Sequence, residues 1–294
     1  MAKRSRGPAR IDADAALFEE ALRFTAAETG LDQRLIEKDY FASLLLAYLN
    51  SADAGTVFKG GTCIAKVHAE FYRLSEDLDF VIPTPVGASR AERSRRAAGT
   101  KRAVALIGQE VEGLRIAEPL RGANNSSQYR AAVAYRSHVG ADDGTIKIEV
   151  GLREPLLRPV LQARARTLLL DPISGGPLVP PAPTRAMSLE EAFAEKFRAA
   201  LTRREPAIRD FYDIDYAVRR LDVRPHEPSF VKLVARKLAV PGNAAVDVSA
   251  SRLRELRLQQ EARLRPVLRP QDYAEFDLER AFEAVSGMAA SVGR

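Results

Sequence analysis

The chain has 294 residues, of which 46% are hydrophobic and 29% charged, so it can build a packed core and is not a disordered protein. No stretch approaches the roughly 20 uninterrupted apolar residues that a membrane-spanning helix requires, which excludes a helical membrane protein. The formal net charge of +6 favours a polyanionic partner, although many soluble basic proteins bind no nucleic acid.

The N-terminal residues indicate where the protein is located, and the cysteine and histidine content excludes several kinds of site. The first ten residues are basic but lack the apolar stretch of a secretory signal, which predicts a cytoplasmic protein. Cys63 is the only cysteine, so an intrachain disulfide and a cysteine-based zinc site are excluded. The three histidines are scattered without metal-ligand spacing, and a histidine-centred mechanism is not expected.

The N-terminal part of the chain has the periodicity of helices. Ile11–Asn50 is predicted to form two helices, the second over about Asp32–Leu49, where apolar residues recur every three or four positions. Val57–Lys59 follows as a short strand. A Gly-Gly-Thr turn then leads into a helix that we expect to cover about 62–72.

The turn at Gly60, Gly61 and Thr62 is the first candidate binding element. Glycines between a strand and a helix let backbone N–H groups approach a phosphate, and the helix N-terminus adds partial positive charge. Lys59 could add a full positive charge, and the Thr62 hydroxyl could either cap the helix or contact a phosphate. The alternative for a Gly-Gly pair taken alone is an ordinary turn.

Two aspartates, Asp77 and Asp79, follow this turn by about 15 residues and favour the binding interpretation. On a strand over Asp77–Ile82 they would project from the same face. Neighbouring carboxylates repel unless a divalent cation lies between them, and Mg²⁺ prefers such oxygen ligands when phosphates complete its shell. A solvated turn is the alternative, but Asp79 lies within an apolar run, where an unpaired carboxylate would be costly. The pair therefore predicts a Mg²⁺ (or Mn²⁺) site for a nucleoside triphosphate.

A helix near 102–112 and a β-hairpin are predicted next. The hairpin strands cover about Tyr129–His138 and Thr145–Gly151, joined by a turn at 140–144. Alternation in the second strand places Glu149 on the face opposite its apolar residues. Glu149 could be a third metal ligand, a general base or an exposed edge residue.

The segment 171–185 is rich in proline and glycine. This composition cannot continue a helix or occupy a central strand, so it is the best candidate for a domain boundary. We expect one domain over 1–183 and a second, helical one over 184–294.

The second domain begins with a capping box, Ser188 with Glu191. Lys196 follows on the apolar stripe of the same helix, where a lysine needs a partner or a ligand unless it reaches out to solvent. Asp210 opens the next helix and could either pair with Lys196 or face a cleft. Asp213 and Asp215 could instead be favoured by the helix dipole alone.

Five motifs in order resemble those of the AbiEii/AbiGii-type nucleotidyltransferase toxins, a group that includes the MenT toxins of mycobacteria. They extend across about residues 36–215, which is most of the chain. The resemblance is carried by Phe58–Thr62, Ser75–Phe80, Ile146–Glu149, Glu191–Arg203 and Arg209–Ile214, preceded by Ile36–Tyr40.

The resemblance implies a bilobed α+β protein. An N-terminal nucleotidyltransferase lobe related to DNA polymerase β, with a mixed sheet, would be joined to a mainly helical C-terminal lobe. It implies a toxin that uses Mg²⁺ and transfers a nucleotide from an NTP to an RNA acceptor, in the better understood branches the 3′ end of tRNA, which blocks translation. A cognate antitoxin is the implied protein partner, and we expect a monomer.

The resemblance also implies roles by position. Asp77 and Asp79 would bind the metal, and Lys196 and Asp210 would be a functional pair from the second lobe. Ser75 aligns with a serine that a kinase-like antitoxin phosphorylates in some relatives, where a phosphate would repel metal and substrate. The residues implied in nucleotide binding are Lys59, Gly60, Gly61, Thr62, Ser75 and Arg203, with Glu149 as a further catalytic candidate.

Two other functions compete with transfer to RNA. The same fold could modify the hydroxyl of a small molecule or a protein, in which case substrate affinity should be insensitive to salt. The chain could also be a non-catalytic module that binds a nucleotide or an antitoxin. Arginines at 90–96 and 252–265 could guide an RNA backbone or be solvated faces.

Overall fold

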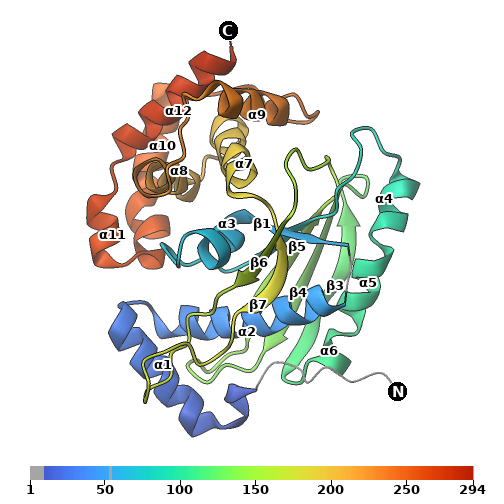
Figure 1. Cartoon of the computed structure of the whole chain (residues 1–294), viewed down its shortest axis with the longest axis vertical. Helices are drawn as coiled ribbons and strands as arrows, with labels where there is room; N and C mark the ends of the chain where they lie inside the picture. The colour runs from blue at the N-terminus through green and yellow to red at the C-terminus, as the bar shows by residue number, and fades with distance from the viewer. Residues whose placement is uncertain (1–9, 53–54, 294) are drawn as a thin grey trace. The chain divides into compact units, whose positions relative to one another are not determined.

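The computed structural model describes residues 10–52 and 55–293 (Figure 1). Contacts divide the chain into two compact units. The first runs to Leu156 and resumes over Val160–Met187, and the second comprises Leu157–Pro159 and everything from Ser188 onward. The basic segment that precedes Arg10 lies outside the described residues.

The first unit contains a mixed seven-stranded sheet of order β3-β4-β5-β2-β1-β7-β6. The pairs β2–β5 and β1–β7 are parallel and the other neighbours antiparallel, as the predicted mixed sheet requires. The strands are β1 (Val57–Lys59), β2 (Leu78–Val81), β3 (Leu114–Ala123), β4 (Gln128–Tyr135), β5 (Gly144–Gly151), β6 (Leu161–Ala165) and β7 (Ala182–Ala186).

Helices surround this sheet. The predicted N-terminal pair is present, and Phe41 of the second helix stacks on Tyr135 of β4 with ring centroids 4.2 Å apart. Asp14 and Asp32 cap the two helices by accepting from backbone N–H groups. The helices of this unit are α1 (Ala15–Thr29), α2 (Gln33–Ser51), α3 (Gly60–Cys63), α4 (Arg90–Arg96), α5 (Ala98–Ala105) and α6 (Ile107–Glu110), with a 3₁₀ turn at Ile11–Ala13 and a π turn at Ile64–His68.

The helix after the Gly-Gly-Thr turn is shorter than predicted. It ends with the π turn at His68, because Glu70 and Phe71 adopt left-handed backbone conformations with φ of 48° and 58°. A buried ion pair fixes the π turn: Lys66 Nζ lies 2.5 Å from Asp39 Oδ1 on α2. Burial lowers the pKa of Lys66, and the charge of Asp39 opposes that shift.

Two other element predictions need correction. The single helix expected near 102–112 is replaced by α5 and α6, which break at Leu106. The proline-rich segment does enter the sheet, since Pro183 lies in β7 between β1 and β6. The proline is tolerated because β7 pairs with β1 where Ala186 lies opposite Phe58, beyond Pro183. The N–H group that the proline lacks is therefore not needed for the pairing of β7 with β1.

The second unit is helical, as predicted. Aromatic contacts hold it together: Phe211 stacks on Phe282 at 6.0 Å, and Phe197 meets Phe230 edge-on at 5.6 Å. The helices are α7 (Leu189–Thr202), α8 (Ile208–Arg220), α9 (Pro228–Leu238), α10 (Ala250–Gln259), α11 (Pro270–Glu275) and α12 (Leu278–Val292), with a π turn at Gln260–Leu264 and a 3₁₀ turn at Arg265–Val267.

The capping box at the start of α7 is only half formed. The Ser188 hydroxyl accepts from the N–H of Glu191 as predicted. The Glu191 carboxylate does not return to the cap; it accepts from the N–H groups of Leu157 and Arg158 and pairs with the buried Lys237 at 2.7 Å. Its burial explains the difference, because a buried carboxylate needs several donors and a cation rather than one N–H.

Among the described residues, no helix is both long enough and apolar enough to cross a membrane.

Candidate functional site

The Gly60 turn lies directly against Asp79. Gly60 has φ +77°, a conformation that favours glycine, and it is the first residue of α3 after β1. A Cβ placed on Gly60 would collide with Asp79 Oδ2 and lie 2.9 Å from Asp79 Cγ. Glycine is therefore required here both by the backbone and by the carboxylate that occupies the side-chain space.

The next residues of the turn contact two other segments. A Cβ on Gly61 would collide with Arg73 Nη2 and lie 3.0 Å from Ser75 Oγ. The Thr62 hydroxyl donates to the backbone carbonyl of Asp77. This side chain is buried and does not cap the helix, whose N-cap is Lys59 without a side-chain cap bond. Thr62 thus ties the turn to the start of the aspartate strand.

Strand register places the acidic residues side by side. Asp79 of β2 pairs with Lys59 of the antiparallel β1 and with Glu149 of the parallel β5. Residues in register on neighbouring strands project from the same face of a sheet, so Asp79 and Glu149 share a face. Asp77 was predicted to begin this strand, but β2 begins at Leu78, so Asp77 lies one position before the observed strand.

Asp77 is half-buried among charges of both signs. Burial raises its pKa; Lys38 and Lys147 pull the pKa down, while Glu76 and Glu149 raise it further. Lys38 is itself paired with Glu76 at 3.0 Å. Burial therefore outweighs the two lysines in setting the pKa of this carboxyl.

Glu149 is engaged across the hairpin. Gln128 Nε2 donates to Glu149 Oε2 at 2.8 Å, and Arg130 Nε lies 3.0 Å from Oε1. The side chain is 37% exposed. Both carboxylate oxygens thus have partners on β4, and each keeps a lone pair that is not used by these two contacts.

The second unit holds a compact cluster around Lys196, which is 14% exposed. Its Nζ lies 2.8 Å from Asp210 Oδ1 and 2.8 Å from Asp213 Oδ2. Arg203 Nη1 lies 2.9 Å from Asp210 Oδ2. The pairing of Lys196 with Asp210 considered from sequence is present, and Arg203 belongs to the same cluster.

Asp213 is the member that sequence reasoning missed. It is fully buried, so the helix dipole alone does not account for it. The signal was available: Asp210 and Asp213 are three residues apart on one helix and therefore share a face. Asp215 lies elsewhere, with both oxygens paired to Arg280 at 2.6 and 3.0 Å and with Arg219 at 3.0 Å, which is a structural role.

The donor atoms of Asp77 and Asp79 decide whether a metal ion fits the predicted site. No cluster of three or more His, Cys, Asp or Glu side chains suited to a metal ion occurs among the residues that the structure describes. Asp77 and Asp79 offer hard oxygen donors beside the Gly60 turn, and Mg²⁺ commonly takes one or two protein carboxylates plus substrate phosphates. The residues therefore fit a cation that arrives with its nucleotide.

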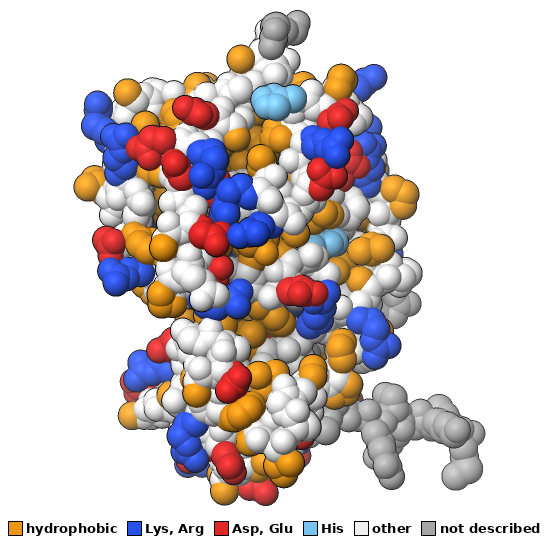
Figure 2. Space-filling model, turned by 60° about the vertical axis from the view of Figure 1, so that its left-hand side comes forward, with side chains coloured by type: hydrophobic (Ala, Val, Ile, Leu, Met, Phe, Trp, Pro, Cys, Tyr) orange, Lys and Arg blue, Asp and Glu red, His pale blue; other side chains and the backbone are white. Residues whose placement is uncertain are grey.

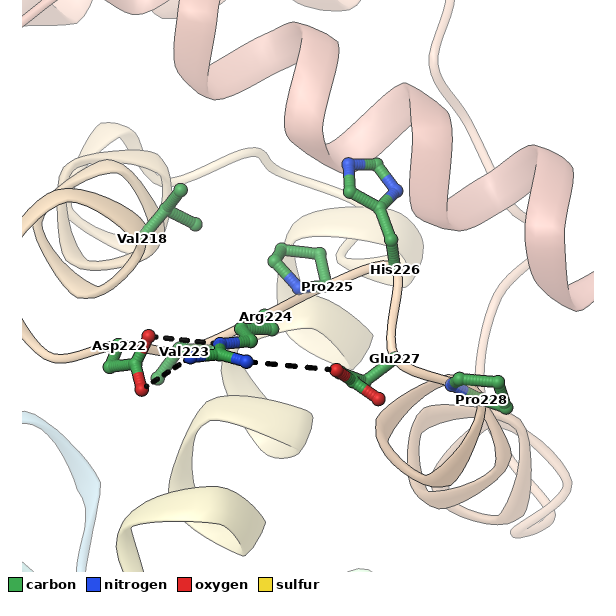
Figure 3. A pocket seen from close by; sticks show the side chains of 8 residues that line it. All are labelled: Val218, Asp222, Val223, Arg224, Pro225, His226, Glu227 and Pro228. Carbon is green, nitrogen blue, oxygen red and sulfur yellow. Dashed lines mark hydrogen bonds and ion pairs between the residues drawn. The ribbon is translucent and has the colours of Figure 1, made fainter.

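The cavity drawn in Figure 3 belongs to the second unit. It has a volume of about 460 Å³ and is lined by the α8–α9 connection of the second unit. Arg224 bridges Asp222 at 3.0 Å and Glu227 at 3.9 Å within it. None of the residues predicted from sequence to bind nucleotide or metal lines this cavity.

The arginine-rich segments give weaker support for RNA binding. On the face shown in Figure 2, Lys and Arg side chains are interspersed with Asp and Glu rather than gathered in one patch. Arg96 of α4 pairs with Glu92 at 2.9 Å, and Arg257 of α10 pairs with Glu279 at 2.6 Å. Arg252 is buried and donates to the carbonyl of Arg203, so it is structural.

Comparison with known families identifies the chain. Residues 43–286 match the family described as "Nucleotidyl transferase AbiEii toxin, Type IV TA system". The chain belongs to the AbiEii nucleotidyltransferase toxin family. The match covers both units and confirms the resemblance drawn from the five motifs.

Solved structures agree with this AbiEii assignment at the level of fold. MenT4, a nucleotidyltransferase toxin from Mycobacterium tuberculosis, superposes with a TM-score of 0.56 at 18% identity, covering 94% of this chain and 98% of MenT4. JHP933 from Helicobacter pylori superposes with a TM-score of 0.50 at 16% identity, covering 89% of this chain and 93% of JHP933. A search of curated proteins finds no match. The predicted fold class is confirmed.

Substituting Gly60 with alanine tests the close approach at the turn of this AbiEii protein. We expect Gly60→Ala to cost about 1–3 kcal/mol of unfolding free energy, because the left-handed backbone is strained for alanine and the new Cβ displaces Asp79. Chemical denaturation measures this loss. Gly87→Ala is the control: its φ is +85°, but open space surrounds its Cβ position, so it reports backbone strain without the collision. Equal losses in the two variants would contradict the predicted contact.

The raised pKa of Asp77 predicts a stability that falls as pH rises. The folded state binds the proton more tightly than the unfolded state, so stability declines as pH rises from the unfolded pKa of 3.8 through the raised folded pKa. We therefore expect Asp77→Asn to increase the unfolding free energy at pH 7 and to flatten its dependence on pH in the acidic range. Denaturation between pH 4 and pH 7 measures both. An Asp77→Asn protein less stable than wild type at pH 7 would contradict the burial argument.

Proposed function

We propose that this AbiEii family member transfers a nucleotide from a nucleoside triphosphate to an RNA acceptor, the 3′ end of tRNA, and thereby blocks translation. The observation that carries the proposal is the contact of Asp79 with the Gly60 turn. A carboxylate beside a glycine turn at a helix N-terminus brings a cation ligand and a phosphate-binding backbone together.

The family indicates the reaction class, which is a nucleotidyl transfer. An acceptor hydroxyl oxygen forms a bond to the α-phosphorus, the bond to the β-phosphate oxygen breaks, and pyrophosphate leaves. The hydroxyl proton passes to a base, for which Glu149 is the candidate, with its carboxylate held by Gln128 and Arg130.

Asp77 and Asp79 would hold Mg²⁺ or Mn²⁺, which when bound supplies positive charge to the reacting oxygens. Backbone N–H groups of Gly60, Gly61 and Thr62 would orient the triphosphate, with Lys59 adding charge and Ser75 a hydroxyl. We assign Lys196 and Arg203 of the second unit to neutralising phosphate charge and Asp210 to holding both cations in position.

The family implies an antitoxin partner, and we propose that one neutralises this toxin. Cytoplasmic location and a monomeric state are parts of the same proposal. Modification of Ser75 by such a partner would place negative charge next to Gly61 and disfavour a triphosphate.

Transfer to a small-molecule or protein hydroxyl is the alternative, and a binding module without catalysis is the third. The mixed charges of Figure 2 keep the first of these open, since no single basic surface marks an RNA path on that face. The salt dependence of acceptor binding distinguishes an RNA acceptor from a small one. An RNA acceptor should bind about 10³-fold more weakly between 50 and 200 mM salt if at least six phosphates are contacted, whereas a small acceptor should not.

The deciding experiment incubates the purified protein with each α-labelled NTP, Mg²⁺ and total tRNA. We expect one or more labelled NTPs to lengthen tRNA, with no product when the divalent cation is chelated. RNA whose 3′-hydroxyl has been oxidised with periodate is the matched control, because it keeps every phosphate but loses the acceptor. Label in protein or in small molecules instead would replace the RNA proposal, and nucleotide binding without any labelled product would support the binding module.

A further inference from the structure

A buried arginine stands at the same turn and is not part of any role assigned above. Arg73 is 3% exposed. Its Nη2 occupies the space in which a Cβ of Gly61 would lie, beside Ser75 Oγ. Nη1 donates to the carbonyl of Leu74 at 3.0 Å, and the guanidinium lies 5.5 Å from the ring centroid of Tyr72. These contacts fix the side chain at the glycine turn.

The electrostatic environment explains why an arginine is placed there. A guanidinium stays charged at every pH at which the protein folds, and burying a charge is costly unless anions lie nearby. The neighbouring segment carries the acidic residues Glu76, Asp77 and Asp79. A triphosphate would add further negative charge to this acidic site, so it needs a cation that the protein supplies in a fixed position.

We propose that Arg73 binds the triphosphate of the nucleotide at the Gly61 turn. This inference rests on the proposed function and adds a residue to it. A planar guanidinium presents paired donors that match two phosphate oxygens, whereas lysine offers a point charge. The absence of a side chain at Gly61 leaves the guanidinium in contact with the backbone that would receive the phosphates. The missing side chain at Gly61 therefore leaves room for Arg73, as the missing side chain at Gly60 leaves room for Asp79.

Binding of inorganic tripolyphosphate tests the proposal without any acceptor. Isothermal titration of the full-length protein with Mg²⁺-tripolyphosphate should give at least tenfold weaker binding for Arg73→Gln than for wild type, with Arg73→Lys between them. Arg10→Gln is the matched control in the same unit: Arg10 is half-buried and paired with Asp12, so its loss should lower stability without changing the affinity. Unchanged tripolyphosphate affinity in Arg73→Gln would overturn the proposal.

A second pair of variants keeps the test valid if Arg73→Gln fails to fold. Gly61→Ala retains the arginine but forces its guanidinium away from the turn. We expect Gly61→Ala to weaken tripolyphosphate binding as Arg73→Gln does. The affinity of the double variant should be no lower than that of the single variant with the lower affinity. Additive losses would show that the two residues act separately. Wild-type protein that binds tripolyphosphate through Arg73 but labels no RNA would contradict the proposed acceptor while leaving the role of Arg73 intact.

Discussion

Replacing Asp79 with asparagine should lower nucleotide transfer by about 100-fold or more, while the protein remains folded. The amide keeps the shape that fits against Gly60 but removes the negative charge. Because a divalent cation binds carboxylates far better than amides, the nucleotide would lose its cation at this position. Single-turnover labelling of the acceptor at saturating NTP measures the effect.

Glu149→Gln is the matched control for this variant. Glu149 lies in register with Asp79 on the neighbouring strand, but its carboxylate is already bound to Gln128 and Arg130. We therefore expect a smaller loss, visible as a changed pH profile if Glu149 acts as a base. If Asp79→Asn retained wild-type transfer, the assignment of the cation site would be wrong, whatever Glu149→Gln did.

Replacing Lys196 with methionine should both unfold the second unit more readily and remove activity. The change leaves Asp210 and Asp213 as neighbouring buried carboxylates, and breaking a buried ion pair from one side costs about 3–5 kcal/mol. Arg203 still reaches Asp210 at 2.9 Å, whereas Asp213 loses a cation that lies 2.8 Å away. Denaturant unfolding measures the stability, and nucleotide transfer below the transition measures the function.

The same unit offers a matched control in Lys237, which is buried between Glu191 at 2.7 Å and Glu195 at 3.1 Å. Lys237→Met should destabilise the protein by a comparable amount, because it also removes a buried cation from two carboxylates, Glu191 and Glu195. No role in phosphate binding is assigned to it, so transfer per folded molecule should remain at the wild-type level. Equal loss of transfer in both variants would show that Lys196 matters only for folding.

The placement of Asp79, Glu149 and Gly60 in the first unit could be predicted from sequence because it depends on short local patterns. Strand alternation over β2 and β5 determines which face carries Asp79 and Glu149. Glycine at a strand-to-helix turn predicts a close approach, and the structure fills that space with Asp79. The hairpin strands also agree, since apolar alternation and a glycine-containing turn are local signals.

The errors arose where distant contacts outweigh local preference. Nothing near the π turn in sequence predicts that Lys66 pairs with Asp39, which precedes it by 27 positions and holds the helix in a short form. Pro183 argued against a strand, yet the register of β7 leaves its missing donor without consequence. Glu191 resembled a capping residue until its partners, Leu157, Arg158 and Lys237, came from other segments.

The sequence by itself determined the family, the mixed sheet, the helical second unit and the residue types of the site, because motif order, periodicity and glycine placement are local properties. Only the tertiary structure decided which charges meet. Asp213 joins Lys196, Glu149 is bound by Gln128 and Arg130, and Arg73 reaches Gly61. Ion pairs and close approaches join residues that folding brings together, and the energy of burying a charge depends on that surrounding set rather than on spacing along the chain.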